Sequence, residues 1–334
     1  MAVPFRWGIL GASGFARRHM IPAMRAGRGM QVAAIASRSA ARAEAAAREH
    51  GIPRAHGSYE ALLDDPDVDG VYIPLPNHLH VPWAVRAAQA GKHVLVEKPV
   101  ALHAAEARGL VEARDRHRVL IQEAAMVRLH PRWLTIRELL RKGKIGELKA
   151  FVGHFGYTMH ARDDVRYDPA MGGGTLLDVG FYPVTMARFC FEEEPTEVAA
   201  TLERDPEAHV DLLVSGVLRF PRGVASFACG MQLAPSQRAD LLGTGGHIQV
   251  ETAWNPPADR PSRLVIERGG SLEAPALESV ELEACNQYTI LAELFARAAR
   301  AGDPAPLPLE DSVKNMKVLD ALFRSAESGR WEKP

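Results

Sequence analysis

The stretch HVLVEKP, residues 93–99, decides the fold of this chain. Its first four residues are mostly apolar or β-branched, which is typical of a buried strand in a parallel sheet. Glu97, Lys98 and Pro99 follow the strand directly. Because open α/β sheets bind ligands outside the carboxyl ends of their strands, we expect Lys98 to contact both a cofactor and a substrate.

Short apolar strands alternate with helices on both sides of this stretch. The alternation predicts a doubly wound parallel sheet of six strands. Five of the six expected strands lie at residues 7–10, 31–36, 68–73, 93–96 and 119–122, with helices at residues 40–50, 78–90 and 103–117.

A glycine turn, GASGFA at residues 11–16, connects the first strand to the first helix. Such a turn lets the backbone bend tightly, and the N-terminus of the helix presents N–H groups to a pyrophosphate. The match to the G-x-G-x-x-G fingerprint is imperfect, because serine and alanine replace the second and third glycines. We expect the cofactor to contact Gly11, Ser13, Gly14 and Phe15.

The second strand ends in Ser37 and Arg38, where an NAD-binding fold usually carries an acidic residue for the ribose 2′-hydroxyl. A hydroxyl and a guanidinium suit a 2′-phosphate instead, and the absence of an acid removes a repulsive charge. The alternative is that Ser39 caps helix 40–50 and that Arg38 is a solvated surface charge. We predict NADP rather than NAD as the cofactor.

The fourth strand leads into PLPNHLH, residues 74–80, a polar loop that contains two prolines. We expect this loop on the nicotinamide side of the crevice, where Leu75, Asn77 and His80 contact the cofactor together with Glu97. The alternative is a plain turn in which Asn77 caps helix 78–90, and both roles can coexist.

From about residue 123, strands follow one another without intervening helices. Several alternate apolar and polar residues, as in an antiparallel sheet with one solvated face. We therefore predict two domains, residues 1–123 and 124–334, a division that the length of 334 residues also favours. The expected elements of the second domain are strands at 147–158, 196–204, 210–220, 223–233, 238–243 and 247–252, a surface loop at 254–261, and helices at 131–142, 286–301 and 310–328.

One helix interrupts these strands, and three glycines, residues 172–174, precede it. Asp178 and Tyr182 are four residues apart on this helix and so share a face. Pro183 predicts a kink near Val179 and Gly180. The Asp and the Tyr are candidate partners of Lys98, but both also suit structural roles, since most buried tyrosines are structural.

The overall composition excludes several classes of protein. A formal net charge of −1 argues against a nucleic-acid or membrane-surface partner. The three cysteines form no CxxC pair, so we expect no disulfide framework, no zinc site and a reducing compartment. We expect no metal. The chain shows no signal peptide and no membrane-length apolar run, so a cytoplasmic location is expected.

Several motifs together resemble one family. They occur in order along most of the chain: GILGAS at 8–13, the loop at 74–80, AGKHVLVEKP at 90–99, GKIGE at 143–147 and GGGxxxDxG at 172–180. In these motifs the chain resembles the glucose-fructose oxidoreductase, inositol dehydrogenase and rhizopine-catabolism (Gfo/Idh/MocA) family. Many members carry a His four residues after the Asp, whereas this chain has Tyr182. In this it resembles the Tyr-bearing branch, which includes glucose-fructose oxidoreductase, dimeric dihydrodiol dehydrogenase, NADP-dependent xylose dehydrogenase and sugar 3-ketoreductases.

The resemblance implies an N-terminal Rossmann domain and a C-terminal α/β domain with a large, mostly antiparallel open sheet. It implies that this sheet forms a homo-oligomer interface, in a dimer or a tetramer, and that the final helices pack back on the Rossmann half. It also implies that Lys98 contacts the cofactor ribose and the substrate, and that the Lys98–Pro99 bond is a candidate for the cis form.

The mechanism we expect is hydride transfer between NADP(H) and a sugar-like polyol, aldose or keto-sugar. Tyr182 donates or accepts the hydroxyl proton, and the Lys98 ammonium lowers its pKa from about 10. Asp178 orients the substrate or balances Lys98, and the candidate substrate ligands are Arg128, His160 and Arg166. Two alternatives remain open: an NADP-binding sensor without turnover, and a redox-neutral sugar lyase or hydrolase that uses transient oxidation.

Overall fold

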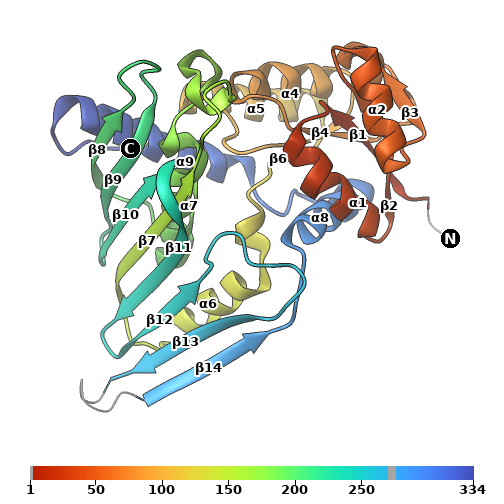
Figure 1. Ribbon diagram of the computed structural model, residues 1–334. Helices are drawn as coiled ribbons and strands as arrows, with labels where there is room; N and C mark the ends of the chain where they lie inside the picture. The colour runs from red at the N-terminus through yellow and green to blue at the C-terminus, as the bar shows by residue number, and fades with distance from the viewer. Residues whose placement is uncertain (1–2, 270–275) are drawn as a thin grey trace. The chain divides into compact units, whose positions relative to one another are not determined.

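The computed structural model describes residues 3–269 and 276–334. The chain divides into two compact units. The first contains residues 1–126 and 286–313, and the second contains residues 127–285 and 314–334. Each unit is built around one sheet, and Figure 1 labels most strands of both.

The first unit contains a six-stranded sheet in the order β3-β2-β1-β4-β5-β6, and every neighbouring pair is parallel. This order is that of the Rossmann fold, so the predicted doubly wound sheet is confirmed. The carboxyl ends of parallel strands share one edge, and the strand order reverses between β1 and β4. The strands are β1 (Phe5–Leu10), β2 (Met30–Ala36), β3 (Arg54–His56), β4 (Gly70–Ile73), β5 (His93–Val96) and β6 (Ile121–Glu123).

Local signals explain where the helices of this unit begin and end. Ser39 and Ser58 cap α2 and α3 through their side chains, and Gly51 ends α2 in the left-handed conformation. The aromatic ring of Phe295 in α8 lies 5.3 Å from Trp7 of β1, which fastens α8 to this sheet. The helical segments are η1 (Ala16–Met20), α1 (Ile21–Ala26), α2 (Ala40–His50), α3 (Tyr59–Leu63), η2 (Asn77–Leu79), α4 (His80–Gln89), α5 (Ala104–His117) and α8 (Gln287–Ala301).

The second unit contains an eight-stranded sheet in the order β14-β13-β12-β11-β7-β10-β9-β8 (Figure 1). Its neighbours are antiparallel except for β7 and β10, which are parallel. The predicted mostly antiparallel sheet is therefore confirmed. The strands are β7 (Leu148–Thr158), β8 (Glu197–Arg204), β9 (Asp211–Arg219), β10 (Val224–Gly230), β11 (Gln232–Gly243), β12 (Gly246–Glu251), β13 (Ser262–Arg268) and β14 (Ala276–Leu282).

Two of these strands, β13 and β14, were not predicted from the sequence. β14 is one of the two edge strands, and none of its residues is fully buried, so it has no buried apolar face for a sequence pattern to reveal. β13 pairs with β14 along its full length and with β12 on its other side, and it buries Leu264 and Ile266.

Helices of the second unit pack against this sheet. Gly153 of β7 faces Pro183 of α7, where a Cβ would lie 3.0 Å from the proline ring. Arg188 of α7 is buried and donates to Asn315 of α9 at 3.2 Å. The helical segments are η3 (Met126–Leu129), α6 (Pro131–Arg141), η4 (Val165–Tyr167), η5 (Pro169–Met171), η6 (Leu176–Gly180), α7 (Phe181–Phe191) and α9 (Leu309–Ser328).

The border between the two units lies close to the expected domain boundary. The expected border lay between residues 123 and 124, and the two units divide between Met126 and Val127. Of the two final helices, α8 belongs to the first unit, whereas α9 from Lys314 onward belongs to the second. Within residues 3–269 and 276–334, no helix combines the length and the apolar character needed to cross a membrane.

Candidate active site

In the first unit, the glycine turn after β1 lies against the loop after β4. Gly11 has a φ of +127°, and a Cβ there would lie only 2.8 Å from Cδ2 of Leu75. The same position is 3.9 Å from the Tyr59 hydroxyl. Only glycine fits both the conformation and the space. The structure therefore brings together Gly11 and Leu75, two residues predicted to contact the cofactor.

The helix that follows this turn begins with an unusual turn. The Ser13 hydroxyl accepts the N–H of Ala16 at 3.1 Å, and the five residues Ala16–Met20 form a π-turn, η1, before α1. Pro22 lies in the first turn of α1 and has no N–H to give to the preceding turn, which favours a local change in hydrogen bonding. Ser13 is thus both a predicted cofactor ligand and the residue that starts this helix.

The end of β2 carries a hydroxyl and a guanidinium. Ser37 is buried, and its Oγ accepts the N–H of Ser39 at 3.3 Å. Ser39 in turn caps α2 through the N–H of Arg42, as the structural alternative predicted. Arg38 is exposed and interacts with the Tyr59 hydroxyl. Burial raises the pKa of Tyr59, and the Arg38 guanidinium acts in the opposite direction. This corner is therefore positive where an NAD-binding fold carries an acid.

His80 connects the two predicted site loops of the first unit. One ring nitrogen lies 2.8 Å from the Leu75 carbonyl, and the other lies 2.7 Å from the Pro99 carbonyl. Burial lowers the pKa of His80 to about 4, although the two carbonyl contacts act against it. The ring therefore holds the loop after β4 beside the loop that carries Lys98.

The residues around Lys98 are also held in place. The Lys98–Pro99 bond is cis. Glu97 accepts hydrogen bonds from the Tyr72 hydroxyl at 2.6 Å and from the Lys98 backbone N–H at 3.2 Å. The N-cap of α4 is Leu79, because a short 3-10 turn, η2, precedes the helix. Asn77, which the alternative placed at the cap of this helix, is instead the first residue of η2.

In the second unit, the carboxylate of Asp178 receives two donors on one oxygen. The Tyr157 hydroxyl donates to Oδ2 at 2.6 Å, and Nε of Arg166 donates to the same atom at 2.8 Å. Arg166 also pairs with Asp164 at 3.0 Å. The negative charge of Asp178 raises the pKa of Arg166 above its usual value, and burial of the guanidinium acts in the opposite direction. Two predicted site residues, Asp178 and Arg166, are thus in direct contact.

The glycines before η6 allow this contact. A Cβ on Gly173 would lie 2.5 Å from the carbonyl oxygen of Arg166, and the N–H of Gly174 donates to that oxygen at 3.0 Å. Any larger residue at position 173 would push the Arg166 segment away from the start of the helix. The glycines therefore place Arg166 beside Asp178.

Tyr182 lies in the first turn of α7, directly after the π-turn η6 that contains Asp178. Its side chain is 5% exposed, and aromatic rings surround it: Phe155 at 5.4 Å and Trp254 at 6.2 Å between ring centroids. Pro183 was predicted to distort the helix near Gly180, and the change from π to α geometry occurs there. The phenol is therefore held in an apolar shell near the helix N-terminus.

Arg128 and His160 were also predicted as substrate ligands. Arg128 lies over the ring of Phe189 at 5.6 Å, two helical turns beyond Tyr182 along α7. His160 is exposed in the loop after β7. Tyr157 was not predicted as a site residue. Its signal was its place in β7, where Phe151 and Phe155 share its side of the strand and Tyr157 is the aromatic residue that carries a polar group.

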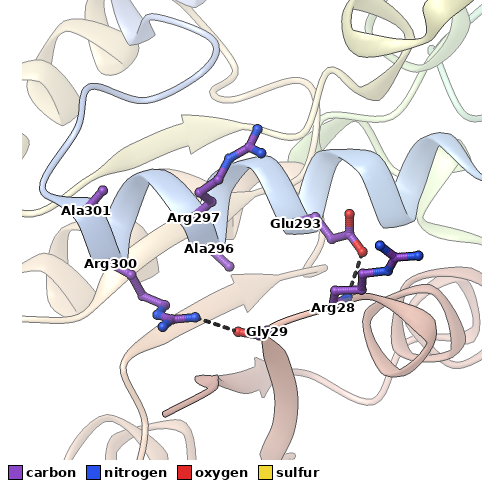
Figure 2. Close-up of a pocket in the computed structure, with 7 residues that line it drawn as sticks. All are labelled: Arg28, Gly29, Glu293, Ala296, Arg297, Arg300 and Ala301. Atoms are coloured by element: carbon purple, nitrogen blue, oxygen red, sulfur yellow. Dashed lines mark hydrogen bonds between the residues drawn. The ribbon is translucent and has the colours of Figure 1, made fainter. Parts of the chain in front are cut away.

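One surface pocket has none of the predicted site residues in its lining. It has a volume of about 630 Å³ and lies between α8 and the turn after α1, both in the first unit. Figure 2 shows Arg300 reaching the Gly29 carbonyl and Glu293 reaching the backbone of Arg28, while Arg297 points the other way.

In the part of the chain that the structure describes, no group of three or more His, Cys, Asp or Glu side chains could hold a metal ion.

Comparison with known proteins matches both units. Residues 5–125 match the oxidoreductase family with an NAD-binding Rossmann fold, Gfo/Idh/MocA, and residues 133–249 match the Gfo/Idh/MocA C-terminal domain. An uncharacterized oxidoreductase of Rhizobium meliloti is 44% identical over 98% of both chains. An NADP(+) D-xylose 1-dehydrogenase of Haloferax volcanii is 36% identical over 97% of this chain and 98% of its own.

A solved structure is similar over almost the whole chain. It is that of a 3-ketoreductase from Actinomadura kijaniata in complex with NADP and TDP-benzene, with 32% identity and a TM-score of 0.90. The match covers 96% of this chain and 98% of that one. The same reductase was also solved with a tyrosine changed to phenylalanine and with a lysine changed to alanine.

Proposed function

The chain belongs to the Gfo/Idh/MocA family of oxidoreductases, and from this premise we propose that it transfers a hydride between NADP(H) and a sugar-like polyol, aldose or keto-sugar. Membership in this family confirms the resemblance drawn from the sequence motifs. Relatives named as an NADP(+) xylose dehydrogenase and as a 3-ketoreductase bound to NADP support the cofactor and the sugar-like substrate.

The residues of the first unit fit a dinucleotide. The glycine at position 11 keeps side-chain atoms out of the turn before η1, and the helix N-terminus there suits a diphosphate. Arg38 and Ser37 would hold a 2′-phosphate. When bound, the nicotinamide supplies or accepts the hydride. The residues that would hold the cofactor are Gly11, Ser13, Gly14, Phe15, Ser37, Arg38, Leu75, Asn77, His80, Glu97 and Lys98.

In this proposal the chain moves the proton that accompanies hydride transfer. The hydroxyl of Tyr182 donates this proton to a carbonyl oxygen or accepts it from an alcohol. The ammonium group of Lys98 favours the phenolate and so brings the pKa of Tyr182 toward neutrality. The rings of Phe155 and Trp254 beside Tyr182, which is 5% exposed, would limit the water around its ring.

The observation that carries the proposal is the arrangement around Asp178. Its carboxylate is held by Tyr157 and Arg166 and lies one turn before Tyr182 in the chain. A carboxylate fixed by two donors orients a substrate hydroxyl better than a mobile one does. Arg166, paired with two carboxylates, contributes little net positive charge, which suits an uncharged sugar ring.

A substrate screen tests the proposal. Aldoses, inositols and keto-sugars are offered with NADP+ and with NADPH, and turnover is followed by nicotinamide absorbance. Tyr182→Phe should then lower kcat by roughly 10²–10⁴-fold, the range typical of a lost general acid or base. The matched control is Tyr167→Phe, which removes the hydroxyl of another buried tyrosine, one that donates to the Met159 carbonyl and accepts from the Gln232 amide.

The outcomes separate the alternatives. Unchanged turnover in Tyr182→Phe would contradict the proton-transfer role. Binding of NADPH without turnover of any sugar would favour a sensor, and product formation without net change in NADPH would favour a redox-neutral reaction.

A further inference from the structure

We propose that Asp211 is a positioning residue for this site: its buried carboxylate anchors the π-turn η6 and so sets the direction of Asp178 and Tyr182. The inference rests on the proposed function for the roles of Asp178 and Tyr182, but the anchor itself is a property of the fold.

The anchor is a direct hydrogen bond from strand to helix. Asp211 is the first residue of β9 and is 2% exposed. Its Oδ2 accepts the backbone N–H of Leu176, the first residue of η6, at 2.6 Å. Leu176 precedes Asp178 by two residues. The carboxylate therefore serves as the cap of this helix although it lies 35 residues away in the sequence.

The adjacent residues strengthen the same connection. Thr175 has the side chain of a good N-cap, but it is in helical conformation and makes no cap hydrogen bond. Its hydroxyl instead donates to the Leu212 carbonyl at 2.9 Å. Two neighbouring residues of the helix start thus bind two neighbouring residues of β9. The helix start is therefore capped by Asp211 from the sheet, and the adjacent threonine does not cap it.

The third glycine of the GGG motif is explained by this carboxylate. Gly174 has a φ of +109°, and a Cβ there would collide with Oδ1 of Asp211. Burial raises the pKa of Asp211, and the N–H of Leu176 acts in the opposite direction. Gly173 makes room for Arg166, and Gly174 makes room for Asp211. The motif therefore brings two groups against the helix start, one that contacts Asp178 and one that holds the turn.

A π-turn needs such an anchor more than an α-helix does. Its backbone hydrogen bonds span five residues rather than the four of an α-helix, and the π conformation is rare as regular structure. If η6 relaxed to α geometry, the residues on one side of it would rotate by about 100° relative to the other side, the rotation of one residue in an α-helix. Asp178 and Tyr182 lie on opposite sides of the end of η6, so their relative direction depends on the turn.

Hydrogen–deuterium exchange of the full chain tests the anchor without any substrate. Asp211→Ala should raise the exchange rate of the amides at residues 176–180 by roughly tenfold or more, because their local opening becomes easier. Asp211→Asn, which keeps one acceptor oxygen, should recover part of the protection. The matched control is Asp205→Ala, which removes a carboxylate that is 1% exposed and accepts the N–H groups of Glu207 and Ala208. It should leave residues 176–180 unchanged.

Kinetics then separate positioning from stability. With a sugar that the wild type turns over, Asp211→Asn should lower kcat by about 10-fold to 10²-fold, the scale of a misplaced catalytic group, while the Kd for NADPH stays the same. Asp205→Ala should change the melting temperature but not kcat. Unchanged exchange at 176–180, or faster exchange with unchanged kcat, overturns the proposal. If the wild type turns over none of the sugars, the proposed function fails, and the exchange comparison by itself still supports or overturns the anchor.

Discussion

At the scale of single residues, we expect the corner at the end of β2 to set the choice of cofactor. Arg38 is exposed beside the Tyr59 hydroxyl, and Ser37 is buried against the start of α2. Tyr59 also lies near Gly11, so the glycine turn and Arg38 meet at one point of the sheet edge. A 2′-phosphate placed there meets a positive charge and no acid.

Arg38→Asp should reverse the preference for NADPH over NADH. A charge-assisted hydrogen bond contributes about 1.5–3 kcal/mol, so the Kd for NADPH should rise by roughly 10-fold or more while the Kd for NADH changes little. Quenching of protein fluorescence measures both constants without a substrate. Arg48→Asp, at an exposed position of α2 paired with Glu44, makes the same charge change as a control. An unchanged ratio of the two constants in Arg38→Asp would refute NADP as the cofactor.

At the scale of elements, both units start a site helix with a π-turn followed by a proline. In the first unit η1 leads to Pro22, and in the second η6 leads to Pro183. Pro183 has no N–H to donate to the Val179 carbonyl four residues earlier. This carbonyl instead accepts the backbone N–H of Phe181 and, at 3.8 Å, the Cys229 thiol. The sequence indicated where the second helix is distorted, because proline acts locally, but not the π geometry.

Another helix, α6, links stability to pH. His130 is its N-cap, and Nδ1 accepts the N–H of Arg132 at 3.1 Å. Burial, helped by the charge of Arg132, lowers the pKa of His130 to about 4. The unfolded chain therefore binds more protons than the folded chain between pH about 6.5 and about 4. The contribution of this residue is present above that window and is lost as pH falls through it.

His130→Asn should flatten the pH dependence of stability in this window. Asparagine keeps an N-cap acceptor but binds no proton in this pH range. The slope of the unfolding free energy against pH should therefore fall by up to about 1.4 kcal/mol per pH unit, the value for one proton. Urea titrations between pH 4.5 and 7, roughly the window of the shift, measure the slope. Cys285→Ser is the control, because it alters the residue 3.5 Å from Nε2 and keeps the imidazole. An equal slope in wild type and His130→Asn would contradict the assignment.

At the scale of the whole molecule, one face of the eight-stranded sheet carries exposed apolar residues. Val224 of β10 and Leu242 of β11 both pair with Ala150 of β7, and Val152 lies two residues further along β7. The side chains of Val152, Val224 and Leu242 are 39–40% exposed. Phe151, which precedes Val152 in β7, points to the opposite face and is buried. Adjacent exposed apolar residues of this kind favour a protein partner.

We expect this face to join copies of the chain into a dimer or a tetramer. The double substitution Val152→Glu and Leu242→Glu should produce monomers, because it would place charges in an apolar interface. Light scattering coupled to size exclusion measures the mass. Val3→Glu, at a residue of the first unit that is 74% exposed, is the control and should leave the mass unchanged. A monomeric wild type would contradict the prediction.

The sequence by itself determined the features that depend on neighbouring residues. The apolar strand before Glu97 and Lys98, the glycine turn at Gly11 and the glycines before Asp178 each have a pattern that is complete within about ten residues. Strand alternation, turn chemistry and helix spacing act over that range. The Rossmann half and the position of Lys98 at a strand end could therefore be predicted.

The tertiary structure alone decided which distant side chains meet. Tyr157 reaches Asp178 across 21 residues of sequence, and Asp211 reaches Leu176 across 35. Both contacts depend on the register of β7 and β9 within the sheet, and pairing partners along a sheet are not specified by the alternation of either strand. Local patterns supplied Asp178, Tyr182 and the glycines, and the sheet supplied the groups that hold them in place.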